Sequence, residues 1–167
     1  FTSFTLIMIS AINPTFTGNK YNLPVQRIVK KSFNYSTEID SVPVRPYRGS
    51  LERTVGKSTE DGGYGGGYLT GSIDTPLSTT DVHTCALLNL FNEDTSKQAL
   101  YHVHHKTPVQ KILEFIRKIF PDFTGVNIVG GDQFQTVNTM RKIGEAVDSV
   151  NPNVTKTYYH TVCENPQ

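Results

Sequence analysis

The apolar positions between residues 86 and 105 predict a β-hairpin. Residues 86–91 (Ala-Leu-Leu-Asn-Leu-Phe) form a short, almost wholly apolar run, which is typical of a buried strand. The polar stretch 92–97 is rich in Asn, Asp and Ser and therefore favours a turn. Residues 99–105 then have the character of a return strand.

Two later stretches carry apolar residues at the spacing of an amphipathic helix. In the first, these residues are Val109, Ile112, Leu113, Ile116 and Phe120. Thr107 is a good N-cap, Pro108 suits the first helical position, and Pro121 should end the helix. The second helix is predicted at about residues 136–150. Residues 126–129 and 154–162 have the composition of strands, the latter near a sheet edge.

The order of elements from residue 70 is therefore strand, strand, helix, strand, helix, strand. This order predicts an α/β layered sandwich, in which two amphipathic helices pack on a mixed β-sheet. We expect a single domain over residues 1–167, with residues 70–167 as its core. Residues 61–69 contain five glycines in six positions and predict a loop, which lacks the Gly-Lys-Ser/Thr of a phosphate-binding loop.

Residues 1–60 are expected to be an extension of short strands and coil. Phe4 to Ile9 form an apolar run that we interpret as a strand, because it is too short to span a bilayer. The segment Val42-Pro43-Val44 is at best an edge strand, because proline cannot donate to a sheet. We expect no insertion into membranes.

The charge balance gives no sign of a nucleic-acid partner. The 167 residues carry a formal net charge of +1, and 19% of them are charged. A strongly basic chain would have indicated binding to phosphates. The chain has two cysteines, Cys85 and Cys163, which is a weak signal for a disulfide framework.

Cys85 stands directly before the first strand of the predicted hairpin, and three histidines stand close to it. If the hairpin turns at residues 93–94, Cys85 lies opposite His102, and His83 lies opposite His104. Opposed residues of antiparallel strands share one face of the sheet. Shifting the register by two residues keeps these side chains together, whereas a shift of one separates them.

A thiol beside an imidazole has a clear chemical use. The imidazole accepts the thiol proton, and the thiolate can then attack the carbon of an amide. The protonated imidazole donates to the leaving amine or ammonia, and afterwards it activates water against the thioester. On composition alone, however, a buried cysteine is more often a small core residue, and a histidine in a strand is more often structural.

The spacing of three residues resembles that of a known enzyme family. Cys85 follows Thr79 by six residues, and His102 follows Cys85 by 17. This pattern is similar to the CheD family of chemoreceptor glutamine deamidases, whose Cys–His core is shared by deamidase toxins of the cytotoxic necrotizing factor type. A strand ending in Gly-Gly (residues 126–131) and a later helix with Lys142-Ile143-Gly144 follow in the family's order.

The resemblance covers roughly residues 70–163 and implies a function. Cys85 would be the nucleophile and His102 the base, and Thr79 would orient the imidazole through its hydroxyl or carbonyl oxygen. No metal or cofactor would take part. The substrate would be a protein with a target glutamine, either a chemoreceptor or a host protein. The enzyme would act in the bacterial cytoplasm or, as a toxin or effector, inside a host cell.

The sequence departs from the family beside the nucleophile. The family has Gly-Ser-Cys or Ser-Gly-Cys, whereas this chain has His83-Thr84-Cys85. Without glycine the backbone next to the nucleophile is more restricted, which bears on the site for the oxyanion. His104 lies on the expected face of His102 and is therefore an alternative base.

Other functions are compatible with the same residues. His102-x-His104 on a strand is a common ligand spacing, and His83 or Cys85 could complete a zinc shell. A non-catalytic interaction module on the same fold is a further alternative. A cysteine protease or a transglutaminase-like acyl transferase would share the first chemical step with a deamidase.

Overall fold

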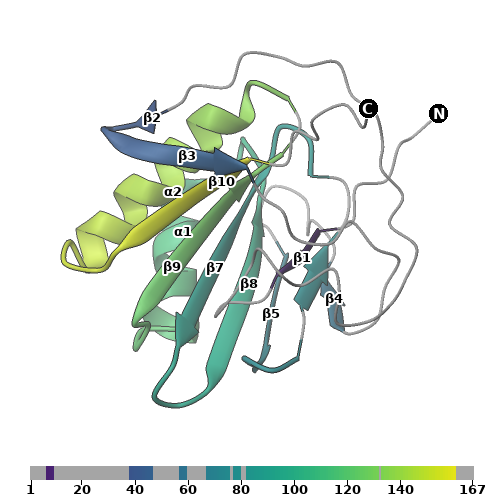
Figure 1. Ribbon diagram of the computed structural model, residues 1–167, viewed down its shortest axis with the longest axis vertical. Helices are drawn as coiled ribbons and strands as arrows, with labels where there is room; N and C mark the ends of the chain where they lie inside the picture. The colour runs from purple at the N-terminus through teal and green to yellow at the C-terminus, as the bar shows by residue number, and fades with distance from the viewer. Residues whose placement is uncertain are drawn as a thin grey trace.

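The computed structural model describes residues 7–9, 38–46, 57–59, 67–75, 77–79, 82–131 and 133–160. A mixed seven-stranded sheet dominates this part of the chain (Figure 1). In spatial order, its strands are β2 (Glu38–Ile39), β3 (Val42–Pro46), β10 (Lys156–His160), β9 (Gly125–Gly130), β7 (Ala86–Asn92), β8 (Lys97–Val103) and β5 (Gly67–Ser72). A second sheet contains β1 (Ile7–Ile9), β6 (Leu77–Thr79) and β4 (Lys57–Thr59), with β6 in the middle.

The main sheet combines both strand directions. β10 pairs in parallel with β3 and β9, whereas β7 pairs in antiparallel fashion with β8 and β9. Helix α1 (Val109–Glu114) continues directly into a π-helical turn, η3 (Phe115–Ile119), and α2 (Thr136–Val150) follows β9. Both helices lie against one side of the sheet (Figure 1). The predicted mixed sheet with two packed helices is therefore confirmed.

The main core fills the space between the sheet and the helices. Leu88 and Leu90 of β7 point into it, together with Ile112 of α1 and Met140 and Ile143 of α2, and all five are fully buried. Burying one such side chain contributes about 1.5–3 kcal/mol. The almost wholly apolar sequence of β7 is explained by its central place, because this strand is buried on both faces.

Gly144 allows α2 to approach the sheet closely. A Cβ atom at this position would lie 2.0 Å from the hydroxyl oxygen of Tyr158 in β10. Burial raises the pKa of Tyr158 to about 12, and the carboxylates of Asp148 and Asp40 add to the rise. The glycine of the Lys142-Ile143-Gly144 segment thus has a packing role.

A smaller apolar cluster lies on the other face of the main sheet. It contains Cys85, Leu87 of β7, Leu100 of β8, Val129 of β9 and Leu77 of β6, along with Val82 and Tyr159. Because β6 belongs to the second sheet, this cluster joins the two sheets. The second sheet lies on the side away from the helices (Figure 1). The candidate site belongs to this face.

The hairpin has a different register from the one predicted. β7 and β8 are joined by residues 93–96, and Leu87, not Cys85, lies opposite His102. The side chain of Asn92 explains the longer turn, because its Oδ1 accepts the backbone N–H groups of Asp94 and Thr95. Ser96 has a φ of 53°, in the left-handed region. The register is thus shifted by two residues, and the faces of the strands are unchanged.

The start of the first helix also differs from the prediction. Pro108, with an extended ψ of 142°, is the N-cap, and the helix begins at Val109. The hydroxyl of Thr107 does not cap the helix and instead accepts the backbone N–H of His104. This bond closes the turn that follows β8. The end of the helix before Pro121 agrees with the sequence, as do the bounds of α2.

Part of the expected extension is built into the main sheet. β3, which holds Val42 and Val44, has β2 on one side and β10 on the other, so it is not an edge strand. Its proline at position 43 pairs with Glu38 of the two-residue strand β2. Proline has no N–H to donate, and the short ladder with β2 contains few hydrogen bonds that it could interrupt. Gly67 to Leu69 belong to β5 and not to a loop; residues 61–66 lie outside the described residues, as do Phe4 to Leu6 and Cys163.

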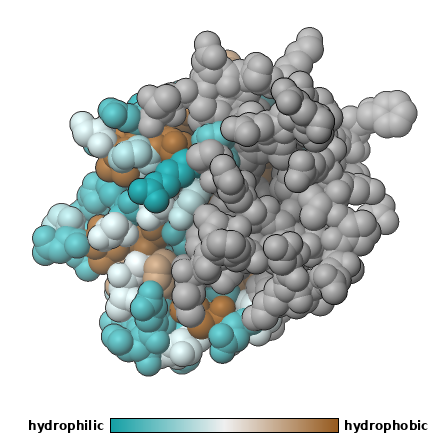
Figure 2. Space-filling model, in the orientation of Figure 1, coloured by the Kyte–Doolittle hydropathy of each residue, from teal (hydrophilic) through white to brown (hydrophobic). Residues whose placement is uncertain are grey.

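The described surface has a mixed character. Figure 2 shows hydrophilic and hydrophobic residues interspersed over the described part of the face in view. The large apolar side chains with the greatest exposure among described residues are Tyr68, Val109, Ile119 and Phe134. Among the described helices, none combines the length and the apolar character that crossing a membrane requires.

Candidate functional site

Thr79 and His102 are in direct contact, although 23 residues separate them in the chain. The hydroxyl oxygen of Thr79, the last residue of β6, lies 2.8 Å from Nδ1 of His102 in β8. Both residues are 0% exposed. This hydrogen bond fixes the orientation of the imidazole ring. If Nδ1 is the donor, the tautomer has its basic lone pair on Nε2.

Cys85 lies on the same side of the sheet as His102. Its side chain is 5% exposed and packs in the smaller apolar cluster with Leu87 and Leu100. Leu87 is opposite His102, and the ladder ends at Ala86 and Val103, so Cys85 lies just outside it, one residue before β7. The structure thus brings Thr79 and His102 into contact and places Cys85 on the same face of the sheet, but Leu87, not Cys85, is the residue opposite His102.

The backbone around Cys85 is held by the junction of β9 and α2. The N–H of Gly131 donates to the carbonyl oxygen of Cys85 over 3.2 Å, and the N–H of Gln133 donates to that of His83 over 3.1 Å. A Cβ atom on Gly131 would lie only 2.2 Å from the carbonyl oxygen of His83. Only glycine allows this close approach. The Gly-Gly end of the strand is therefore a support for the segment before the candidate nucleophile.

The other histidines lie at the rim of the site. His83 is partly exposed, and so is His104, the residue after β8. Nδ1 of His104 accepts the backbone N–H of Lys106, and its ring packs on that of His105 with centroids 4.2 Å apart. The His105 ring in turn shares a hydrogen bond of 3.0 Å with the hydroxyl of Thr84. The two candidate bases thus differ: His102 is buried and fixed by Thr79, while His104 belongs to the turn.

The described residues do not form a metal site. No group of three or more His, Cys, Asp or Glu side chains in the described ranges is arranged to hold a metal ion. A tetrahedral zinc site needs three or four such ligands converging on one point. The alternative in which His102 and His104 bind zinc with His83 or Cys85 therefore gains no support from the arrangement of these side chains.

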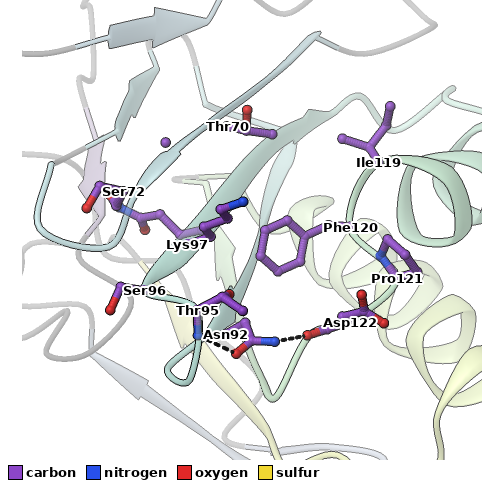
Figure 3. Close-up of a pocket in the computed structure, with 12 residues that line it drawn as sticks. Thr70, Ser72, Asn92, Thr95, Ser96, Lys97, Ile119, Phe120, Pro121 and Asp122 are labelled. Atoms are coloured by element: carbon purple, nitrogen blue, oxygen red, sulfur yellow. Dashed lines mark hydrogen bonds between the residues drawn. The ribbon is translucent and has the colours of Figure 1, made fainter.

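A groove of about 760 Å³ lies at the far end of the hairpin. It is bordered by the ends of β5 and β8, the turn after β7 and the segment after η3, with Lys97, Phe120 and Asp122 among its lining residues (Figure 3). The side chain of Asn92 donates to the backbone carbonyl of Asp122 and closes the groove on one side (Figure 3). Cys85 precedes β7, whereas the groove lies at its end, so the groove is separate from the candidate site.

Three polar residues of α2 also contact the site. The sequence did not single out Thr136 and Thr139, and it marked Lys142 only as part of the Lys142-Ile143-Gly144 segment. Thr136 and Thr139 donate hydrogen bonds to backbone oxygens before β7, and Lys142 donates to those after β8. Their spacing of three residues was a visible signal, because such residues lie along one side of a helix. On a helix packed against a sheet, a polar stripe of this kind points to backbone groups that need partners.

Comparisons with known proteins give no match: no protein-family model, no curated protein and no solved structure is significantly similar to this chain.

Proposed function

We propose that this protein is a cysteine-dependent glutamine deamidase that acts on protein substrates. The observation that carries the proposal is the buried hydrogen bond between Thr79 and His102. The resemblance in spacing assigned these two residues, with Cys85, to one catalytic unit. A threonine and a histidine 23 residues apart have no local reason to meet, so their contact supports that assignment.

The proposed chemistry begins with the transfer of the Cys85 thiol proton to His102. The thiolate attacks the side-chain carbonyl carbon of a substrate glutamine and forms a tetrahedral intermediate. The intermediate collapses to a thioester as His102 protonates the leaving ammonia. His102 then takes a proton from water, which attacks the thioester and releases glutamate and free Cys85. Thr79 keeps the imidazole oriented throughout, as the third member of such a unit does.

The low exposure of Cys85 sets a condition on this mechanism. The thiol is 5% exposed, so a substrate glutamine must reach it past the more exposed neighbours His83 and Thr84. The same burial favours a second candidate function, a non-catalytic interaction module in which Cys85 and His102 are structural. Reactivity separates the two, because only an activated thiolate reacts rapidly with iodoacetamide at neutral pH.

The proposal is tested with a mixture of glutamine-containing peptides and candidate bacterial and host proteins. Conversion of glutamine to glutamate is followed by mass spectrometry, and ammonia release by a coupled assay. Cys85→Ser should abolish both signals, whereas Cys163→Ser, the matched control, should preserve them. If ammonia release survives in Cys85→Ser, the nucleophile is assigned wrongly.

The base is tested with two parallel substitutions. His102→Ala should abolish turnover, and His104→Ala should leave most of it, because the hydroxyl of Thr79 holds the His102 ring in place. The reverse result would make His104 the base. Stoichiometric zinc in the purified protein, removed by a chelator together with activity, would replace the deamidase mechanism with a metal-dependent one.

A further inference from the structure

Two threonines on one side of α2 hold the segment that carries Cys85. The hydroxyl of Thr136 donates to the carbonyl oxygen of Cys85 over 2.6 Å, and that of Thr139 donates to the carbonyl oxygen of Thr84 over 3.0 Å. Thr136 also accepts the N–H of Gly131 over 2.8 Å. The backbone on both sides of the candidate nucleophile is therefore anchored to the helix.

Lys142 extends the same stripe by one further step of three residues. Its ammonium group donates to the carbonyl oxygens of His105 and Thr107, over 2.9 and 2.8 Å. These residues form the turn that follows β8, the strand of His102. One side of α2 thus bonds the segment before β7 and the segment after β8. It joins the two pieces of chain on which the proposed nucleophile and base depend.

Lys142 also differs from the threonines in carrying a charge. Burial lowers the pKa of this lysine, and the negative charge of an ionised Cys85 acts in the opposite direction. The hydrogen bonds give the geometric link: Lys142 bonds the carbonyl oxygen of His105, and the ring of His105 is bonded to the hydroxyl of Thr84. Thr84 is the residue directly before Cys85. Coulombic attraction is mutual, so a positive Lys142 favours the thiolate over the thiol. The two carbonyl oxygens keep the ammonium group in place while leaving it one more donor.

We propose that Lys142 is a positioning residue of the Cys85 site, which ties the 105–107 turn to α2 and supplies the positive charge that favours the Cys85 thiolate. This inference rests on the proposed function, since it takes Cys85 as the nucleophile. Lys142 acts through Cys85 and does not itself transfer a proton. Its contribution is therefore visible in the reactivity of the thiol, even without a protein substrate.

The test is the pH profile of Cys85 alkylation by iodoacetamide in the full-length Cys163→Ser protein. Lys142→Met removes the charge and should slow alkylation at pH 7 by about three- to tenfold, with the midpoint of the profile moved to higher pH. Lys142→Arg retains the charge and should stay within about twofold of the parent. The midpoint of the alkylation profile should therefore depend on whether residue 142 carries a positive charge, and not on the length of its side chain.

Lys156→Met is the matched control. This lysine is also partly buried and bonded, to Asp148, but it lies beside Val126 at the opposite end of β9 from Gly131. The pH profile of Cys85 alkylation in Lys156→Met should have the same midpoint as in the parent protein. An equal shift in Lys156→Met, an unchanged profile in Lys142→Met, or a Lys142→Arg profile like that of Lys142→Met would each overturn the proposal.

Lys142→Gln is the second variant should Lys142→Met fail to fold, because an amide still donates to a carbonyl oxygen. It should show the same shift as Lys142→Met, and an unshifted profile would overturn the proposal. Deamidation is measured on the same variants in parallel. A charge-dependent alkylation profile without any conversion of glutamine would support the role of Lys142 and refute the deamidase.

Discussion

The hydrogen bond between Thr79 and His102 can be removed with little change in shape. Thr79→Val replaces the hydroxyl with a methyl group and leaves the volume of the side chain almost unchanged. Both residues are 0% exposed, so water does not readily take the place of the lost hydroxyl. The variant therefore isolates the contribution of a single polar contact of 2.8 Å.

The expected loss of stability follows from burial. Removing one partner of a buried hydrogen bond, so that the other remains in a dry site, costs about 1–3 kcal/mol. Thr79→Ser keeps the oxygen and loses one methyl group, for which about 1 kcal/mol is expected. If the bond matters, Thr79→Ser should be the more stable variant despite its smaller side chain.

The assay is urea unfolding followed by far-ultraviolet circular dichroism, at a pH where free imidazole is neutral. Deamidation by both variants is measured beside it. Thr79→Val should lower kcat more than it raises KM, because the disoriented imidazole fails in the transition state. Thr79→Ser should retain most of kcat. Equal unfolding free energies of the two variants, or equal effects on kcat and KM, would refute this reasoning and leave Thr79 with a packing role.

Three further outcomes are expected. Thr136→Val deletes a hydroxyl that bonds both Cys85 and Gly131 and should lower the unfolding free energy by about 1–3 kcal/mol in urea titrations; a loss below 0.5 kcal/mol would contradict the anchor. Gly131→Ala forces a Cβ atom to within 2.2 Å of the carbonyl oxygen of His83 and should destabilise by about 1–3 kcal/mol or more, measured as a fall in Tm. Tyr158 keeps its proton more tightly in the folded state, with a pKa of about 12 against an ordinary 10.0, so its share of stability is complete below pH 10 and is lost as the pH rises toward 12. Urea midpoints across this range should fall, and less steeply in Tyr158→Phe.

The elements with strong local signals were predictable from the sequence. α2 shows apolar residues at helical spacing over four turns, and the structure gives it the predicted bounds, Thr136–Val150. β7 shows a continuous apolar run, which its burial on both faces requires. In α2 the spacing of apolar residues follows from packing one helix face against the sheet. In β7 the continuous apolar run follows from burial of both strand faces. Both patterns are local, so the sequence shows them directly.

The pairing of distant segments could not be predicted in this way. β3 lies beside β10, more than a hundred residues later in the chain, and its two valines gave no sign of a parallel partner. The contacts of Lys142 with His105 and Thr107 are likewise tertiary. A lysine on an amphipathic helix has the same local pattern whether it faces solvent or a turn with free carbonyl oxygens.

The hairpin register could not be predicted from the composition of the turn alone. The sequence indicated a turn at 92–97, but the number of turn residues was set by Asn92, whose side chain accepts two backbone N–H groups. The resulting shift of two residues preserves the alternation of faces, so Cys85 and His102 still share a side. A shift of one would have placed them on opposite sides of the sheet.

The same shift sharpens the choice of base. If the ladder continued past its last pair, Ala86 with Val103, then Cys85 would face His104. The ladder ends there, because the N–H of His104 donates to Thr107 and its Nδ1 accepts from Lys106. A base must present a basic nitrogen to the thiol in a fixed direction. His104 uses one ring nitrogen to close a turn, whereas His102 has its ring held by Thr79 on the face of Cys85. The geometry of the turn therefore favours His102, even though simple extension of the register would have favoured its neighbour.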